Sequence, residues 1–119
     1  MMKKKVATPP VKDKWGKKAM SGGFTTIPHI LFEKGYEHGL NHYEQLILLH
    51  LISYWWSYKS PVFPSHETLS HKTGISTRTI GRNLKSLEEK GWIKTTKRYN
   101  ASSTYDLDGL IKKVELMAS

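Results

Sequence analysis

The chain has 119 residues and a mass of 13.7 kDa, which suffices for one globular domain and not for two. It contains no cysteine, so disulfides, thiolate metal ligands and thiol nucleophiles are excluded. The sequence has no apolar run near the roughly 18 residues that span a bilayer, and its lysine-rich start lacks the apolar core of a signal peptide. We therefore expect a cytoplasmic protein that is neither inserted in a membrane nor bound to one.

Basic residues dominate the chain and are concentrated in two blocks. Lys and Arg number 19 against 10 Asp and Glu, which gives a formal net charge of +9 and a pI of about 9.8. Residues 1–20 hold seven lysines and one aspartate, and residues 71–98 hold eight basic and two acidic residues. The rest of the chain is mildly acidic. This distribution indicates a polyanionic partner.

Residues 1–20 are predicted to form a basic flexible arm that precedes a domain over residues 21–119. The lysines repel one another, and Pro9–Pro10 argues against a helix in this arm. Trp15 and Met20 are candidates for docking the arm on the domain or on a second subunit. The arm has two interpretations: its lysines contact the polyanionic partner, or it is an unstructured tail that only increases solubility. The lysines of the arm are Lys3, Lys4, Lys5, Lys12, Lys14, Lys17 and Lys18.

Helical signals begin in the first half of the predicted domain. The β-branched and aromatic stretch from Phe24 to Leu31 contains a proline, which predicts a short extended piece running into a turn of helix. Asn41, with Glu44 three residues later, has the pattern of a capping box. Apolar residues at helical spacing then predict a helix that ends near Tyr58, ahead of two prolines.

A short turn separates two further predicted helices. Ser65 is placed to cap the first, which runs to Thr73 and stops at a glycine. Ser76 is placed to cap the second, which runs to Lys90 and also stops at a glycine. This spacing is a helix-turn-helix pattern.

After the second of these helices the apolar period changes from 3.6 to about 2. Residues 92–99 are predicted to form a strand, residues 100–103 a turn and residues 104–107 the returning strand. Asp108 is placed to cap a last helix. The apolar stripe of that helix consists of Leu110, Ile111, Val114 and Met117.

The predicted helix from Ser76 to Lys90 has two opposite faces. Three apolar residues define a buried face, and three basic residues fall on the other side. These residues are Ile80, Leu84 and Leu87 on the first face and Arg78, Arg82 and Lys85 on the second. Gly81, beside the basic face, has no side chain to hold a partner away. Arginine can donate two hydrogen bonds to guanine, so this face suits the DNA major groove; a merely solvated basic face is the alternative.

The run from Pro64 to Ile93, PSHETLSHKTGISTRTIGRNLKSLEEKGWI, resembles the winged helix-turn-helix of bacterial and phage DNA-binding proteins. GntR and MarR regulators and the N-terminal domains of plasmid and phage replication initiators share its pattern. Upstream, WGKKAMSGGFTTIP and LILLHLISYWW resemble the N-terminal part of small helix-turn-helix proteins of bacterial genomes and mobile elements. The resemblance implies a winged helix, mainly α with a small β-hairpin wing, that binds double-stranded DNA at the nucleoid.

The resemblance also implies a set of contact residues, to which the basic hairpin adds lysines that suit phosphates. The predicted base-contacting residues are Ser76, Thr77, Arg78, Thr79 and Arg82. The predicted phosphate-contacting residues are Lys85, Lys94, Lys97, Arg98, Tyr99 and Asn100. No effector domain follows the helix-turn-helix as it does in GntR proteins, so we expect no small-molecule effector domain.

Metal binding and catalysis find little support in the sequence. His38, His42 and His50 lie near one another, but the first two are not on one continuous helix and no cysteine completes a site, so we expect no metal and no cofactor. His66 and His71 are candidates for phosphate contacts when protonated. The sequence has no Gly-rich phosphate loop, nucleophile elbow or paired carboxylates, so we expect no enzymatic activity.

The cluster of Tyr54, Trp55, Trp56 and Tyr58 has two interpretations. These rings could stack on the bases of single strands. Their helical spacing favours packing instead, with two or three of them in the core.

Transcription regulation, by a repressor that occludes its site, is the favoured role. A replication-initiation or mobile-element protein is the alternative, and a winged-helix protein-interaction adaptor is a third hypothesis. Winged-helix regulators usually pair to read two half-sites, so we expect a homodimer. The apolar stripe of the last helix is the preferred dimer surface. In the alternative, the last helix folds back on the first long helix of the same chain.

Overall fold

The computed structural model describes residues 11–119, and within them six helices and two strands follow one another. The elements are α1 (Val11–Trp15), α2 (His29–Lys34), α3 (His42–Ser53), α4 (His66–Thr73), α5 (Thr77–Glu89), β1 (Lys94–Arg98), β2 (Ala101–Asp106) and α6 (Asp108–Ala118). This order confirms the predicted class, mainly α with a small β-hairpin wing. No helix in the described part of the chain is long and apolar enough to cross a membrane.

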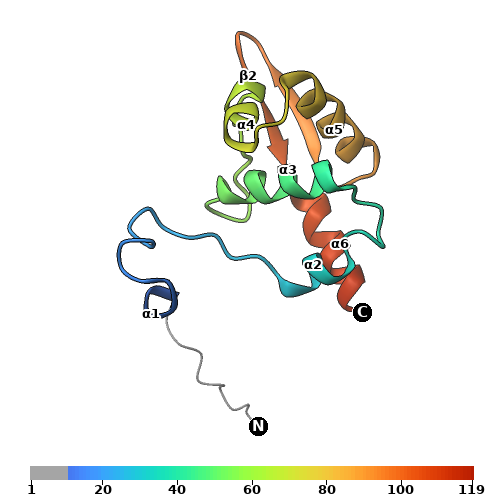
Figure 1. Ribbon diagram of the computed structural model, residues 1–119. Coiled ribbons are helices and arrows are strands. Elements are labelled where there is room, and N and C mark those ends of the chain that lie inside the picture. Colours follow the sequence, from blue (N-terminus) through green and yellow to red (C-terminus); the bar gives the residue numbers. More distant parts are fainter. Residues whose placement is uncertain (1–10) are drawn as a thin grey trace.

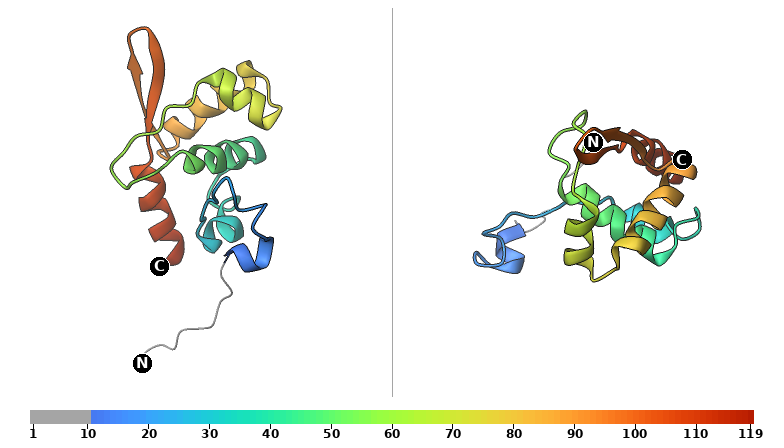
Figure 2. Two further views of the ribbon diagram at one scale, coloured as in Figure 1. Left: turned by 90° about the vertical axis from the view of Figure 1, so that its left-hand side faces the viewer. Right: turned by 90° about the horizontal axis from the view of Figure 1, so that it is seen from above.

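Helix α3 lies across the middle of the domain. It packs against α4 and α5, which lie toward the same end as the hairpin, while α2 and α6 pack together toward the other end (Figure 1). The core between these elements is built from aliphatic side chains and two fully buried rings, those of Trp92 and Tyr105. The hairpin tip and the C-terminal end of α6 therefore point to opposite ends of the molecule (Figures 1 and 2).

The N-terminus of α3 is fixed by the predicted capping box. The Asn41 side chain accepts a hydrogen bond from the Glu44 backbone N–H at 2.7 Å, and the Glu44 carboxylate accepts one from the Asn41 backbone N–H at 2.8 Å. Both bonds satisfy backbone donors that have no partner inside the helix.

The C-terminal end of α3 differs from the prediction, because the helix stops at Ser53 and not near Tyr58. The backbone N–H groups of Tyr54 and Trp55 bond to carbonyls three residues back, so the last turn tightens and the chain leaves the helical path. The prediction that two or three of the four clustered rings lie in the core is met only in part, because two of them pack against the core without being fully buried. Tyr54 and Trp55 are half-buried against the core, while Trp56 is 90% exposed and Tyr58 is also exposed.

The two helices of the helix-turn-helix begin and end as predicted. Ser65 Oγ accepts from the Thr68 N–H at 3.0 Å, and Ser76 Oγ accepts from the Thr79 N–H at 3.2 Å, so each serine caps its helix. Gly74 ends α4 with φ of +77°, a left-handed conformation that costs glycine little.

The hairpin is antiparallel, with Lys94 opposite Asp106 and Thr95 opposite Tyr105. Its turn is at Tyr99–Asn100 and not over residues 100–103 as predicted, because Asn100 adopts φ of +53° and the chain already pairs again at Ala101. Asparagine tolerates this conformation better than most residues. An isolated bridge from Val62 to Tyr105 lies beside the two strands.

The start of α6 is held by a different residue from the one predicted. Asp108 is the first helical residue, and its backbone N–H donates to Asp106 Oδ1 at 2.8 Å. The apolar stripe of α6 packs within its own chain, where Leu110 and Met117 are buried and the helix contacts α2. The helix thus folds back, but onto α2 rather than onto the long helix α3.

The arm contains a short helix, α1, contrary to the prediction. A proline directly before a first helical turn is compatible with the helix, since the N–H it lacks would have no partner there. Trp15 remains 63% exposed, so it is not docked on the domain, while Met20 is half-buried.

Candidate nucleic-acid interface

Helix α5 presents the two faces that its sequence predicts. Ile80, Leu84 and Leu87 are buried in the core. The three basic residues opposite them are exposed; they are Arg78, Arg82 and Lys85. The helix is thus anchored along one side by apolar contacts and offers long cationic side chains to solvent on the other. A surface of this kind can donate hydrogen bonds to base edges or phosphates.

The first turn of α5 uses two predicted contact residues for its own cap. The Ser76 hydroxyl accepts from the Thr79 N–H and lies 3.0 Å from the Thr79 hydroxyl. Thr77 is exposed and Thr79 is half-buried. The hydroxyls that close this turn therefore stand at the helix N-terminus, next to Arg78, where backbone N–H groups and the helix dipole favour an anionic partner.

Gly81 faces the other helix of the motif, which the sequence did not suggest. A Cβ built at this position would lie 3.4 Å from Cε1 of His66, so the glycine faces the start of α4 and not a partner of α5. His66 itself is exposed at this crossing. A Cβ at Gly81 would thus make an ordinary van der Waals contact with a side chain of α4.

A polar cluster missed by the sequence interpretation ties α5 to α3. Glu44 is fully buried, and Lys90, at the C-terminal cap of α5, donates from Nζ to Glu44 Oε1 at 2.8 Å. The Ser86 hydroxyl donates to the other carboxylate oxygen, and Lys90 Nζ also donates to the Gly39 carbonyl at 2.6 Å. The capping-box pattern was visible in the sequence, but no local pattern connects Glu44 with residues 42 and 46 positions away.

The charge of Glu44 is stabilised by this cluster. Burial alone would raise the pKa of Glu44, but hydrogen bonds from Lys90, Ser86 and the Asn41 backbone, together with the charge of Lys90, outweigh that effect and lower its pKa. The carboxylate is therefore ionised at neutral pH. Lys90 belongs to the basic block of the sequence, yet its charge is matched inside the protein.

A second hydrogen-bond chain runs through the middle of α5. Asn41 Nδ2 donates to Asn83 Oδ1 at 3.2 Å, and Asn83 Nδ2 donates to the Thr79 carbonyl at 2.9 Å. Asn83 is buried, so these bonds satisfy an amide that would otherwise be costly. The start of α3 thus holds α5 at its middle as well as at its C-terminal end.

The wing places its predicted phosphate contacts in different settings. Arg98 Nε donates to the Ser102 carbonyl at 2.7 Å, and its guanidinium lies 5.2 Å from the Phe63 ring, so Arg98 braces the hairpin. Lys94 lies directly across from Asp106. The remaining three are exposed along the hairpin and at its tip; they are Lys97, Tyr99 and Asn100.

The arm lysines fall into two groups. Those within the described residues are exposed; they are Lys12, Lys14, Lys17 and Lys18. Lys3, Lys4 and Lys5 lie outside the described residues. The Lys14 ammonium is 5.9 Å from the Trp15 ring.

The histidines are dispersed over several elements. His38 Nδ1 lies 3.0 Å from the Lys34 carbonyl, and the His42 ring lies against Tyr36. Within residues 11–119, no group of three or more His, Asp or Glu residues is arranged to hold a metal ion. Burial, with the charge of Lys72, lowers the pKa of His50, which favours its neutral form.

The helix-turn-helix of α4 and α5, followed directly by the β1–β2 hairpin, defines a winged helix-turn-helix protein. Residues 38–93 match a family model described as "Helix-turn-helix domain". This match covers α3, α4 and α5 and confirms the predicted motif. The domain supports DNA binding by this chain.

The fold is similar to a crystal structure of the N-terminal domain of DnaD protein from Geobacillus kaustophilus HTA426. The TM-score is 0.67, the sequence identity is 22%, and the match covers 88% of this chain and 88% of that chain. Among curated proteins, no sequence matches this chain significantly. The structural likeness concerns the fold.

Proposed function

We propose that this protein binds double-stranded DNA in a sequence-specific manner through α5. The observation that carries the proposal is the exposed basic face of a helix whose opposite face is buried and whose middle and C-terminal end are tied to α3. Arg78, Thr79 and Arg82 would contact base edges, with Ser76 and Thr77 beside them at the helix start. A helix held this firmly keeps its side chains in one register with the groove.

The phosphate contacts would come from elements that flank α5. They are Lys85, Lys94, Lys97, Arg98, Tyr99, Asn100 and the lysines of the arm. Such contacts position the protein without reading sequence. Residues 21–119 would form the DNA-binding domain and residues 1–20 a basic arm. Because Arg98 already braces the wing, it would contribute to DNA affinity in two ways: by contacting a phosphate and by maintaining the shape of the hairpin.

Within this chemistry we propose a non-enzymatic transcription regulator that represses by occluding its site, and a homodimer as its active form. Pairing would match a palindromic site with two half-sites. Because the apolar stripe of α6 is used largely within the chain, the dimer surface would lie elsewhere or involve only the exposed side of α6. Gel filtration with light scattering tests this point, and a strict monomer, both free and DNA-bound, would contradict the dimer.

A replication-initiation or mobile-element role is the second candidate. It is supported by the resemblance of the run from Pro64 to Ile93 to the N-terminal domains of plasmid and phage replication initiators. Direct-repeat binding sites beside a replication gene would favour it, whereas palindromic sites in the protein's own promoter would favour the repressor. A protein-interaction adaptor would show absent or salt-insensitive DNA binding.

Selection from a random duplex library, followed by titration of the selected site at two salt concentrations, tests the proposal. We expect a defined motif bound at least ~10³-fold more tightly than random duplex, with affinity that falls as salt rises. Salt-dependent binding without an enriched motif would contradict sequence-specific binding and would indicate an architectural protein that contacts phosphates alone. Absence of binding would contradict DNA binding altogether.

A further inference from the structure

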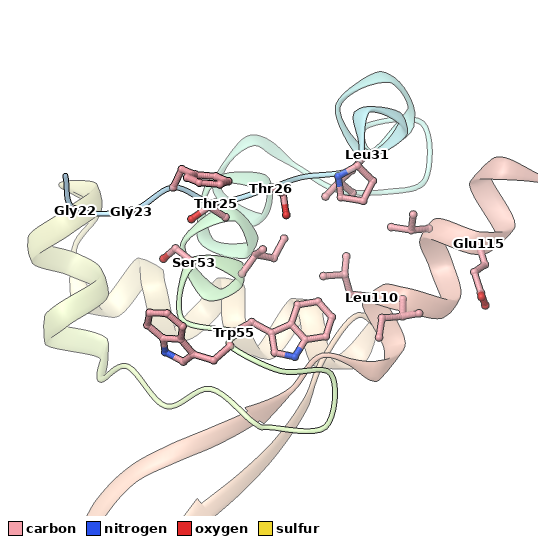
Figure 3. Close-up of a pocket in the computed structure, with 15 residues that line it drawn as sticks. Gly22, Gly23, Thr25, Thr26, Leu31, Ser53, Trp55, Leu110 and Glu115 are labelled. Atoms are coloured by element: carbon pink, nitrogen blue, oxygen red, sulfur yellow. The ribbon is translucent and has the colours of Figure 1, made fainter. Parts of the chain in front are cut away.

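A cavity of about 680 Å³ opens at the end of the domain that carries α2 and α6. It is enclosed by the extended segment of residues 22–28, the C-terminal end of α3 with the residues that follow it, and one side of α6 (Figure 3). The volume is within the range of roughly 300–1,000 Å³ that is usual for small-molecule sites. The hairpin tip points away from this end, so the cavity is separate from the wing.

The floor of the cavity is apolar and is formed by side chains of the hydrophobic core. Leu31, Ile52 and Leu110 are buried, and Val114 is half-buried against them. The α6 stripe that was predicted to serve dimerisation thus supplies part of this lining. An apolar floor of this kind favours a ligand with a hydrophobic body.

Aromatic rings form the rim. Trp55 is half-buried beside the cavity, whereas Trp56 and Phe24 also line it but are 90% and 61% exposed. Large rings left in water next to an apolar cavity gain free energy when a ligand covers them. Their faces are also electronegative, so they attract a cation.

Apart from the indole N–H groups of Trp55 and Trp56, which only donate, the side-chain polar groups of the lining can accept hydrogen bonds. They are the hydroxyls of Thr25, Thr26 and Ser53 and the carboxylate of Glu115. Glu115 lies on α6 at one edge of the cavity (Figure 3) and is the charged residue among the described residues that line it. An ammonium group, which only donates, matches acceptors and aromatic faces, whereas a carboxylate would be repelled by Glu115.

We propose that this cavity binds a small amphiphilic organic amine, with an aromatic or aliphatic body between the apolar floor and the indole rim and its ammonium group toward the edge that carries Glu115. The site needs no separate effector domain, because it is built from the same helices as the winged helix. Most of the positive charge of the chain belongs to the arm, α5 and the wing, and none of the described residues that line the cavity is a lysine or arginine. The proposal does not depend on DNA binding.

The test uses the full chain, labelled with ¹⁵N at its four tryptophan indoles, and three probes of one shape. The probes are 4-phenylbutylamine, 4-phenylbutan-1-ol and 4-phenylbutanoate, which share a phenylalkyl body and end in a cationic, a neutral and an anionic group. We expect saturable shifts of the Trp55 and Trp56 indole signals, with little change at Trp15 and Trp92. The amine should bind more tightly than the alcohol by about twofold to fivefold, and the carboxylate most weakly.

Two variants with matched controls locate the ligand. Glu115→Gln should weaken the amine by about twofold to fivefold and leave the alcohol unchanged, while Glu37→Gln, an exposed acid away from the cavity, changes neither. Trp56→Ala should weaken both probes by about fivefold to tenfold, while Trp15→Ala changes neither. Because Glu115, Trp56 and both control residues are exposed, these variants should fold.

Several results would overturn the proposal. Absence of saturable shifts at Trp55 and Trp56 with any probe would show that the cavity is not a ligand site. Tighter binding of the carboxylate than of the amine would show that the chemical class is wrong. Equal effects of Glu115→Gln and Glu37→Gln on the amine would remove Glu115 from the site.

Discussion

Lys90 at the C-terminal end of α5 forms an ion pair of 2.8 Å with Glu44 in the first turn of α3. The carboxylate is fully buried, whereas the lysine side chain is 39% exposed. The pair joins the two helices at the point where α5 ends and the wing begins. It therefore fixes the angle at which the basic face of α5 is presented.

Removing the lysine should leave a buried charge without its main partner. We predict that Lys90→Met lowers the free energy of unfolding by about 1–2 kcal/mol, less than for a fully buried pair because Lys90 is partly solvated. Urea unfolding measures it. Lys112→Met is the matched control, since Lys112 forms a 3.3 Å pair with Asp108 at the surface and should change stability by less than about 0.5 kcal/mol. Equal effects of the two substitutions would contradict a structural role for Lys90.

The same pair predicts a dependence of stability on pH. The pKa of Glu44 is lowered in the folded protein from its usual 4.5, so the unfolded chain takes up this proton first as the pH falls. The stabilisation is fully present above pH 4.5 and is lost as the pH falls through the folded pKa. The stability difference between the wild type and Glu44→Gln should therefore be largest near neutral pH and shrink in acid. A stability difference between the two proteins that stays constant down to pH 3 would contradict the predicted pH dependence.

Two glycines should respond to alanine in opposite ways. A Cβ at Gly109 would lie 2.1 Å from the Gly91 carbonyl oxygen, so Gly109→Ala should cost more than about 2 kcal/mol. A Cβ at Gly81 would only touch the exposed ring of His66 at 3.4 Å, so Gly81→Ala should stabilise α5 by about 0.5–1 kcal/mol. Thermal unfolding of both variants gives the comparison. Destabilisation by Gly81→Ala would show that the His66 ring cannot move.

The start of α6 should depend on Asp106 and not on Asp108. Asp106→Ala removes the acceptor for the Asp108 N–H and should cost about 0.5–1.5 kcal/mol. Asp106→Asn keeps an acceptor oxygen and should restore most of this loss, which separates the cap from the charge. Asp108→Ala should change stability by less than about 0.5 kcal/mol in the same urea titration. The reverse order would favour the cap predicted from the sequence.

Local signals were sufficient to predict the motif. The serine caps of α4 and α5, the glycines that end them and the apolar face of α5 each depend on residues within a few positions of one another. The two faces of α5 were therefore predicted residue by residue. The capping box of α3 was found for the same reason.

The features that were missed depend on tertiary contacts. The buried pair of Glu44 with Lys90 and the position of Gly81 beside His66 involve separate elements, so no periodicity reveals them. The end of α3 was misplaced because apolar spacing continues into Trp55 and Trp56 after the backbone has left the helix. The turn of the wing was misplaced because a single residue, Asn100, reverses the chain.

The most direct test of the account is the affinity of Arg78→Ala for the selected DNA site and for random duplex. We predict a loss of about 1–3 kcal/mol on the selected site and a much smaller loss on random DNA. Lys97→Ala should weaken both alike by loss of a phosphate contact, and Lys112→Ala, an exposed lysine on α6, should weaken neither. If Arg78→Ala leaves binding to the selected site intact, α5 is not the element that reads the sequence.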